Sequence, residues 1–390
     1  METLLVGGAV RDGLLKTGAK DRDYVILNSS TEELVAKGFT QVGTTYPIFL
    51  HPRTGAECVL VSDLELDLRR RDFTINAMAQ RDDGTIIDLA SGRDDLKNKV
   101  LRHVSESTFS DDPLRIYRLA RFKAELPEFS IAAETLELAR RTISCEKLRE
   151  IPPERVFHEL RKSLHTDRPS VFFETLRDLG LLQAHYCELA RLVGVPQRVE
   201  YHPEGDAWVH TMLVLDHSVQ IAPDLPTRYA ALVHDLGKGV TRKELLPRHI
   251  GHEESGLREV KRMSERLKVP GNWVEAALVV TRHHLKVHRL GEMKANSIVR
   301  MFYQIDAFRQ PQLVQILAGA CKADELGKNK NPLNGLTPLE ACFQCVRSIS
   351  AKDLTATLSG KAIGDAIRAL RVRRLKDFLK GEPSPLATRT

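Results

Sequence analysis

The sequence lacks a long hydrophobic run and has few cysteines, and each absence excludes a class of protein. No apolar stretch in the 390 residues is long enough to span a bilayer, which excludes a helical membrane protein. The first residues have neither the basic nor the apolar region of a secretory signal, so we expect a cytoplasmic protein. The six cysteines are scattered, which argues against a disulfide framework.

The charge of the chain is nearly balanced, with a formal net charge of +6, but its positive charge is clustered. Such clusters are typical of proteins that bind nucleic acid or nucleotide phosphates, so we expect a partner of this kind. The clusters are Arg69-Arg70-Arg71, the series Arg115, Arg118, Arg121 and Lys123, the pair Arg140-Arg141, and Arg155 with Arg161-Lys162.

The N-terminal segment predicts a site for a phosphate group. The apolar run Leu4 to Val6 meets Gly7-Gly8, and the residues that follow have helical spacing. This order indicates a strand, a tight turn and the start of a helix. Glycines allow a phosphate to approach the backbone closely, and a helix N-terminus offers free N–H groups and positive charge.

Two carboxylates follow this turn. If residues 21–27 form a strand, Asp21 and Asp23 lie on one face of it and Arg22 on the other. Two carboxylates beside a phosphate site suit Mg²⁺ and a nucleoside triphosphate.

Two further motifs combine arginine and aspartate. In Arg69-Arg70-Arg71-Asp72-Phe73-Thr74-Ile75-Asn76-Ala77, an Arg-Asp pair ahead of a predicted helix could bind triphosphate oxygens. In the second motif, Asp111-Asp112-Pro113-Leu114-Arg115, the spacing of Asp112, Arg115 and Arg118 places them on one face of a helix predicted over 110–123. Such a face could hydrogen-bond a base edge, or it could be only a helix cap and a salt bridge.

In this order, the motifs resemble those of bacterial class II tRNA nucleotidyltransferases, the CCA-adding enzymes. The resemblance covers at least residues 1–200. It implies a polymerase-beta-like head and in-line attack of a tRNA 3′-hydroxyl on the α-phosphate of CTP or ATP. Asp21 and Asp23 would be the catalytic carboxylates that bind Mg²⁺. The implied nucleotide-binding residues are Gly8, Arg11, Arg71, Asp112, Arg115, Arg118 and Arg121, with Asp112 and Arg115 on the base edge.

One departure from the family leaves the product open. Only Ser62 to Leu68 separate Val61 from Arg69, where the family has a longer flexible loop associated with the switch from cytosine to adenine. The chain could therefore add only CC, or another element could replace the loop and allow full CCA addition. A bacterial poly(A) polymerase, which shares this head, is a further alternative.

The second half of the chain is rich in histidine. His234-Asp235 ends an apolar run, and a buried His-Asp pair is costly unless it is paired or bound to metal. His210, His234 and Asp235 resemble the signature of the HD phosphohydrolase superfamily, and for its final aspartate we favour Asp324 over Asp306. The other histidines of this region are His249, His252, His283, His284 and His288.

The HD resemblance implies a phosphatase or 2′,3′-cyclic phosphodiesterase that uses Ni²⁺ or another divalent transition metal and repairs tRNA 3′ ends. Alternatively, this domain could bind tRNA without turnover. Two other classes remain: an HD hydrolase with an RNA-binding head, and a basic tRNA-binding protein without enzymatic activity. We expect no membrane partner, and a monomer or a homodimer.

The whole pattern predicts an α+β protein in four parts. Strand-like runs mark a nucleotidyltransferase head with a small mixed β-sheet over residues 1–104. Helical patterns continue over 105–200, where the resemblance implies an all-α neck and body that carries the nucleotide template and binds tRNA, and residues 196–203 read as a linker. An all-α HD domain follows over 201–328, and a helical tail over 329–390.

Overall fold

The computed structural model describes residues 1–18, 22–42, 47–328, 337–354 and 359–381. The chain forms two compact units, each of which is described by itself. Unit 1 comprises Met1–Glu159 and Val171–Leu181, and unit 2 comprises Leu160–Ser170 and Leu182–Thr390. The division into four functional parts remains a prediction.

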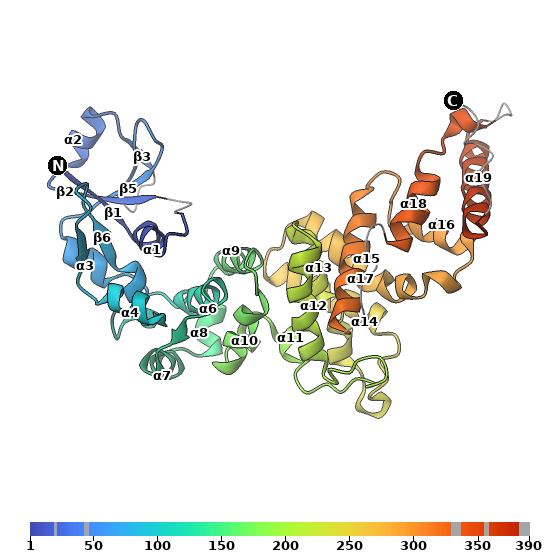
Figure 1. Ribbon diagram of the computed structural model, residues 1–390, viewed down its shortest axis with the longest axis horizontal. Helices are drawn as coiled ribbons and strands as arrows, with labels where there is room; N and C mark the ends of the chain where they lie inside the picture. Colours follow the sequence, from blue (N-terminus) through green and yellow to red (C-terminus); the bar gives the residue numbers. More distant parts are fainter. Residues whose placement is uncertain (19–21, 43–46, 329–336, 355–358, 382–390) are drawn as a thin grey trace. The chain divides into compact units, whose positions relative to one another are not determined.

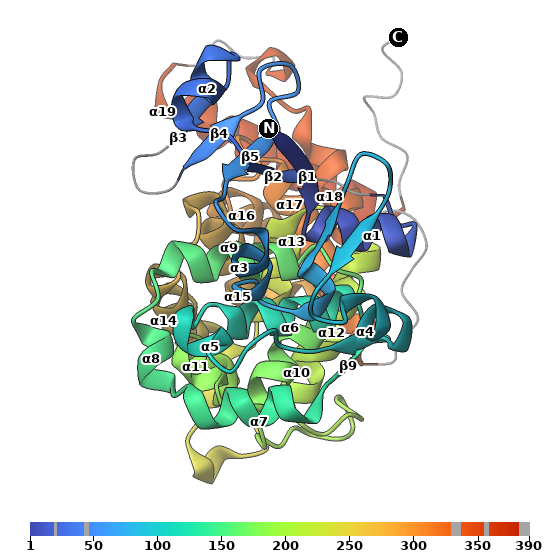
Figure 2. The ribbon, with the colours of Figure 1, turned by 90° about the vertical axis from the view of Figure 1, so that its left-hand side faces the viewer.

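Unit 1 contains a small mixed sheet, as expected. Its strands are β1 (Glu2–Val6), β2 (Asp23–Leu27), β3 (Thr40–Val42), β4 (Ile48–Leu50), β5 (Glu57–Leu60), β6 (Met78–Gln80) and β7 (Ile86–Asp88). Their order in the sheet is β3-β4-β5-β2-β1-β6-β7, and Figure 2 shows the first five of them in this order. β2 and β5 run parallel, whereas the other neighbouring strands run antiparallel.

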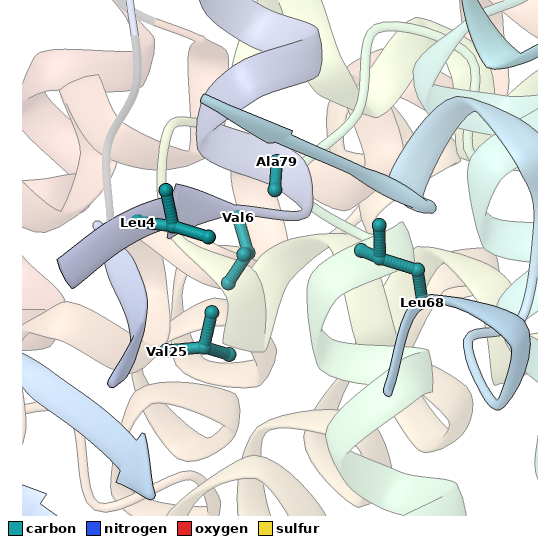
Figure 3. Packing of buried hydrophobic residues seen from close by; sticks show 5 residues of the cluster. All are labelled: Leu4, Val6, Val25, Leu68 and Ala79. Carbon is teal, nitrogen blue, oxygen red and sulfur yellow. The ribbon is translucent and has the colours of Figure 1, made fainter. Parts of the chain in front are cut away.

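Both faces of this sheet are covered, because apolar residues occupy both sides of the central strand β2. Val25 packs with Leu4, Val6, Ala79 and Leu68 of α3 (Leu64–Arg69), as Figure 3 shows. The next residue, Ile26, points to the opposite face. It packs there with a second buried cluster that includes Leu34 of α2 (Thr31–Ala36), Phe39, Phe49 and Cys58. Helices α2 and α3 therefore cover opposite faces.

The predicted strand, turn and helix at the N-terminus are confirmed. Strand β1 ends at Val6, and α1 (Gly8–Leu15) begins two residues later. Gly7 between them has φ 70°, a left-handed conformation that strains residues with a side chain. The Gly7 N–H donates to the carbonyl of Met78, 3.1 Å away, which ties the turn to β6.

The rest of unit 1 is mainly helical. It contains α4 (Gly92–Asn98), the short paired strands β8 (Val100–Leu101) and β9 (Ser130–Ile131), α5 (Thr108–Asp111), α6 (Arg115–Glu125), α7 (Ala133–Thr142), α8 (Cys145–Arg149), and residues of α9 (Pro153–Ser163) and α10 (Ser170–Asp178). The single helix expected over 110–123 is wrong, because the chain breaks between α5 and α6. Pro113 lacks an N–H, and it disfavours helical backbone at the residue before it.

In the described part of unit 2, all regular secondary structure is helical (Figure 1). Its longer helices are α12 (Ala207–Ile221), α13 (Leu225–Val233), α14 (His252–Arg266), α15 (Gly271–His288), α16 (Ala295–Gln304), α17 (Gln312–Gly327), α18 (Pro338–Arg347) and α19 (Lys361–Leu379), preceded by the short α11 (Cys187–Ala190). Helices α12, α13, α15 and α17 pack together, and Val214, Ala231 and Ala323 meet in their core. Among the described residues, none of the helices has the length and hydropathy needed to cross a bilayer.

The segment 196–203 is not an open linker. It forms no helix or strand, but Gln197 is only 4% exposed. The Nζ of Lys238 donates to Oε1 of Gln197, 2.5 Å away, so this residue ties the segment to the histidine-rich region of unit 2.

Candidate active site and metal centre

The first candidate site lies in unit 1, at the turn between β1 and α1. Asp23, at the start of β2, is paired in antiparallel register with Val6, the last residue of β1. Directly opposed residues point to the same face, so the exposed Asp23 carboxylate lies beside the Gly7-Gly8 turn. Asp21 lies outside the described residues, so its predicted partnership with Asp23 stays a prediction.

Three of the predicted nucleotide-binding arginines gather around this turn. A Cβ at Gly7 would lie 2.6 Å from Nη1 of Arg71, so a side chain at this position would displace that guanidinium from the turn. Arg11 on α1 is buried, and its Nη1 donates to Oδ1 of Asn76 at 2.8 Å. The guanidinium carbons of Arg11 and Arg118 lie 5.1 and 5.5 Å from the ring centroid of Phe122. Each of the three arginines pairs with a carboxylate, Asp12, Asp67 or Asp72. Guanidinium groups around a helix start, with Gly8 beside them, suit a polyphosphate that would compete with these partners.

Asp72 positions one of these arginines, a role that the sequence did not reveal. Its carboxylate is 5% exposed and accepts hydrogen bonds from the Phe73 N–H at 2.8 Å and from Nδ2 of Asn76 at 3.0 Å. It also accepts from Nε of Arg118 at 2.7 Å. Burial alone would raise the pKa of Asp72, but the Arg118 charge and these hydrogen bonds outweigh it and lower the pKa. The expected helix after Asp72 is only a 3-10 turn, Thr74–Asn76, followed by β6.

The spacing of Asp112, Arg115 and Arg118 predicts that they share one helix face, but the structure does not place Asp112 on that face. It has extended backbone, φ −147° and ψ 99°, and lies just before α6. Its Oδ1 accepts from the Leu114 N–H at 3.1 Å, and its Oδ2 lies 2.8 Å from Nη2 of Arg155. Arg115 donates to the carbonyls of Thr108 and Arg70. The side chains of Asp112 and Arg115 therefore have separate partners, although the Arg115 N–H donates to the Asp112 carbonyl at 3.0 Å.

Arg121, expected to bind nucleotide phosphate, lies in the interior instead. It is 5% exposed, with Nε 2.5 Å from Oε2 of Glu159 and Nη1 2.6 Å from Oε1 of Glu125. Its guanidinium also lies over the Phe122 ring, at 4.1 Å. Two carboxylates therefore pair with Arg121 in the described structure, and its role in nucleotide binding stays a prediction.

The second candidate site lies in unit 2, where the structure brings together the four HD residues predicted from the sequence. His210 is on α12, His234 and Asp235 follow α13, and Asp324 is on α17. All four are at most 2% exposed. Nε2 of His210 lies 3.0 Å from Oδ1 of Asp324 and 3.7 Å from Oδ2 of Asp235, and Nε2 of His234 lies 3.2 Å from that same oxygen.

The donor atoms of this cluster fit a divalent metal ion. Three buried donor or acceptor atoms lie at ion-pair distance from other members of the cluster but form no hydrogen bond with good geometry. They are Nε2 of His210, Nε2 of His234 and Oδ1 of Asp324. Buried polar atoms without partners are costly, and imidazole with carboxylate is a common ligand set for transition metals. His210, His234 and Asp324 each offer one atom within a span of 4.8 Å, as a shared ion requires.

Polar residues around the cluster orient its ligands. Oε1 of Glu204 lies 2.7 Å from Nδ1 of His210, which directs Nε2 of that ring towards Asp324. Burial opposes ionisation of Glu204, but hydrogen bonds from His202 and His210 lower its pKa to about 2. No periodic pattern of the sequence points to Glu204, because this residue lies in a loop.

Asp324 has charged partners on its other side. Its carboxylate lies 2.5 Å from Nε2 of His288 and 2.8 Å from Nζ of Lys328. Burial alone would raise the pKa of Asp324, but Lys328 and the two histidines keep it well below its usual value. Asp306, the alternative to Asp324, is instead 40% exposed beside Arg309 and outside the cluster.

Three family models match separate parts of the chain. The poly A polymerase head domain matches residues 47–102, the probable RNA and SrmB-binding site of polymerase A matches residues 128–192, and the HD domain matches residues 208–317. The head-domain match lies in unit 1, which contains the first candidate site, and the HD match lies in unit 2, which contains the second.

Curated relatives match nearly the whole chain. The multifunctional CCA protein of Dechloromonas aromatica is 41% identical over 403 residues, covering 97% of this chain and 98% of that protein. The multifunctional CCA protein of Leptothrix cholodnii is 44% identical over 400 residues, covering 95% of each. Among solved structures, the Thermotoga maritima CCA-adding enzyme complexed with tRNA has a TM-score of 0.64 and 20% identity, covering 98% of this chain and 88% of that one. At 20% identity, the similarity to this structure shows that the two chains share a fold.

Proposed function

Because the chain belongs to the multifunctional CCA protein family, we propose that it adds the 3′-terminal CCA to tRNA, using CTP and ATP and no nucleic-acid template. The identity of 41–44% to relatives of that name, over at least 95% of their length, carries this proposal. Similar folds in CCA-adding enzymes solved with tRNA, CTP and ATP support these three partners.

In the proposed reaction, the tRNA 3′-hydroxyl oxygen bonds to the α-phosphorus of the nucleotide, and pyrophosphate leaves. Arg11, Arg71 and Arg118 would hold the triphosphate, with Gly8 allowing it to approach the start of α1. Asp23, together with Asp21, would bind Mg²⁺. When bound, such ions favour the ionised hydroxyl and neutralise the charge of the leaving pyrophosphate.

Asp112 and Arg115 would recognise the base edge of the incoming nucleotide. In the described structure Arg155 holds the Asp112 carboxylate, and Arg115 contacts two carbonyl oxygens. Base recognition by these residues therefore requires that the nucleotide replaces those contacts. Arg121 pairs with Glu125 and Glu159 in the described structure, so it would bind the nucleotide only if the nucleotide replaces those contacts as well.

A second candidate product is CC without the terminal adenosine. The connection from β5 to Arg69 consists of one short helix, α3, where the family has a longer flexible loop. This difference calls for a test of the product length.

We further propose that unit 2 is a metal-dependent phosphohydrolase. His210, His234, Asp235 and Asp324 would bind Ni²⁺ or another divalent transition metal, which when bound would activate water and polarise a phosphate ester. The buried ligand atoms without hydrogen bonds support this assignment. The substrates would be phosphomonoesters and 2′,3′-cyclic phosphates such as those at damaged tRNA 3′ ends.

Labelled-nucleotide incorporation tests the transferase proposal. A tRNA that lacks its CCA end should incorporate CTP, and the Asp23→Ala variant should lose incorporation while it still binds tRNA in a gel-shift assay. An unrelated RNA serves as the control substrate. Incorporation of ATP alone, on either RNA, would instead identify a poly(A) polymerase, and unchanged activity in Asp23→Ala would contradict the assigned site.

A further inference from the structure

Asn76 is buried beside the arginines of the proposed triphosphate site in unit 1. It is the last residue of the 3-10 turn Thr74–Asn76 and is 5% exposed. Its Oδ1 accepts from Nη1 of Arg11 at 2.8 Å, and its Nδ2 donates to Oδ1 of Asp72 at 3.0 Å. A side chain this buried offers almost no surface to a nucleotide, so an effect of Asn76 on nucleotide binding must pass through these two partners.

The two partners fix the Asn76 amide in one orientation. A guanidinium has only N–H donors, so the amide atom that faces Arg11 is the oxygen. The carboxylate of Asp72, whose pKa is lowered by Arg118 and by its hydrogen bonds, only accepts when it is ionised, so the amide nitrogen faces Asp72. Asparagine meets both demands with one short side chain, whereas an ionised aspartate has no donor and leucine, of similar size, has neither group.

The pair of Asn76 and Asp72 connects two helices that are far apart in the sequence. Oδ2 of Asp72 accepts from Nε of Arg118 at 2.7 Å. Three hydrogen bonds therefore run in series from Arg11 on α1, through the turn, to Arg118 on α6. The guanidinium carbons of these two arginines also lie 5.1 and 5.5 Å from the ring centroid of Phe122, so both groups are supported by the same aromatic ring.

Arg11 has one further anchor, which does not lead to Arg118. Its Nε donates to Oδ1 of Asp12, the next residue of α1, at 2.8 Å. This contact holds Arg11 within its own helix. The hydrogen bonds that reach Arg118 from Arg11 pass through Asn76.

We propose that Asn76 is a positioning residue of the transferase site, which couples the guanidinium of Arg11 to that of Arg118 so that one triphosphate meets both in fixed orientations. This inference rests on the proposed transferase function, and it gives a role to a residue outside the nucleotide-binding set. Groups that are oriented before a ligand arrives lose less conformational freedom when it binds. Asn76 should therefore strengthen CTP binding without contacting CTP.

Titration of the full chain with CTP in the presence of Mg²⁺ tests the coupling. Asn76→Ala should weaken CTP binding by about tenfold, because it removes the hydrogen bonds to two charged groups. Arg11→Lys and Arg118→Lys keep the positive charges but lose the fixed fork of the guanidinium. The losses of independent sites multiply, so Asn76→Ala combined with either lysine variant should cost clearly less than the product of the two single losses. The combination with Arg118→Lys is decisive, since the hydrogen bonds connect Asn76 to Arg118 through Asp72.

Thr74→Val is the matched control in the same turn. Thr74 is 3% exposed, and its Oγ1 donates to Oδ2 of Asp95 at 2.7 Å, away from the arginines. Urea unfolding should show that this variant folds and is destabilised like Asn76→Ala, while its CTP affinity changes by less than about twofold. Asn76→Asp is a second test variant of nearly the same size. It keeps an acceptor for Arg11 but cannot donate to the ionised Asp72, so it should also weaken CTP binding.

The outcomes separate this inference from the proposed function. CTP affinity within about twofold of the wild type in folded Asn76→Ala or Asn76→Asp would overturn the coupling and leave the transferase proposal intact. Losses that multiply fully between Asn76→Ala and Arg118→Lys, or an equal loss of affinity in Thr74→Val, would overturn it in the same way. A folded wild type that neither binds CTP nor incorporates it into tRNA would contradict the transferase itself, and this inference with it.

Discussion

Oδ2 of Asp72 lies 2.7 Å from Nε and 2.6 Å from Nη2 of Arg118, a residue 46 positions further along the chain. This pair ties the Arg-Asp motif after α3 to helix α6. It holds one arginine of the proposed triphosphate site in a fixed orientation, so Asp72 acts as a positioning residue.

Replacing Asp72 by asparagine removes the charge but nearly preserves the shape of the side chain. Hydrogen bonds to charged groups contribute about 1.5–3 kcal/mol, so Asp72→Asn should lower the free energy of unfolding by about that amount in urea. It should also raise KM for CTP, because Arg118 is no longer held. The control is Glu65→Gln, which breaks an exposed ion pair with Arg69 and should change stability by less than about 1 kcal/mol. If Asp72→Asn and Glu65→Gln changed the free energy of unfolding and the KM for CTP by equal amounts, the positioning role of Asp72 would be contradicted.

The same pair should make stability depend on pH in a defined direction. Burial favours the neutral form of Asp72, but Arg118 and the hydrogen bonds outweigh it, so the folded-state pKa lies below the value of about 3.9 for an unfolded aspartate. The stabilisation is therefore complete well above pH 4 and is lost as the pH falls through the folded pKa. The stability difference between the wild type and Asp72→Asn should be constant from neutral pH down to about pH 5 and shrink in stronger acid. A difference that shrinks as the pH rises would have the wrong sign.

Gly7→Ala separates backbone strain from loss of the phosphate site. Gly7 has φ 70° and Gly84 has φ 86°, so alanine at either position should cost about 1–3 kcal/mol of stability. Only at Gly7 would the new methyl group meet Arg71, since a Cβ at Gly84 has no neighbour within 4 Å. Nucleotide incorporation should therefore fall at least about tenfold in Gly7→Ala, which corresponds to 1.4 kcal/mol, and stay near wild type in Gly84→Ala. A similar loss in both variants would assign the effect to strain.

Glu204 should control metal affinity in unit 2 through His210. Loss of a carboxylate that orients a ligating histidine typically weakens metal binding by about 10–100-fold. Ni²⁺ titration calorimetry of Glu204→Gln should show a loss of this size, with CTP incorporation by unit 1 unchanged. Glu200→Gln, at an exposed position in the same loop, is the control and should bind Ni²⁺ as the wild type does. Unaltered Ni²⁺ affinity in Glu204→Gln would exclude the orienting role.

Features that are local in the chain could be predicted from the sequence. The turn at Gly7 follows from an apolar run that ends in two glycines, and the adjacent His234 and Asp235 necessarily lie together. Contacts across long stretches of chain could not be predicted. Nothing in the periodicity of α6 indicates that Arg118 meets Asp72, or that Arg121 is buried against Glu159.

The error at Asp112 has a different cause. The spacing of Asp112, Arg115 and Arg118 predicts a shared helix face only if the helix continues through Pro113, whose ring ends one helix before the next begins. Glu204 was missed because a loop residue has no periodic pattern, and only the folded loop brings its carboxylate to His210.

The most direct test of the central claim is the length of the product, read at single-nucleotide resolution. Purified protein is incubated with Mg²⁺, a tRNA transcript that lacks its CCA end, and CTP with or without ATP. The account predicts growth by two nucleotides with CTP alone and by three with both nucleotides. Growth that stops at two nucleotides in the presence of ATP would contradict full CCA addition. The short connection before Arg69 would then be the first feature to test as its cause. No growth with a correctly folded protein and an intact tRNA transcript would contradict the transferase itself.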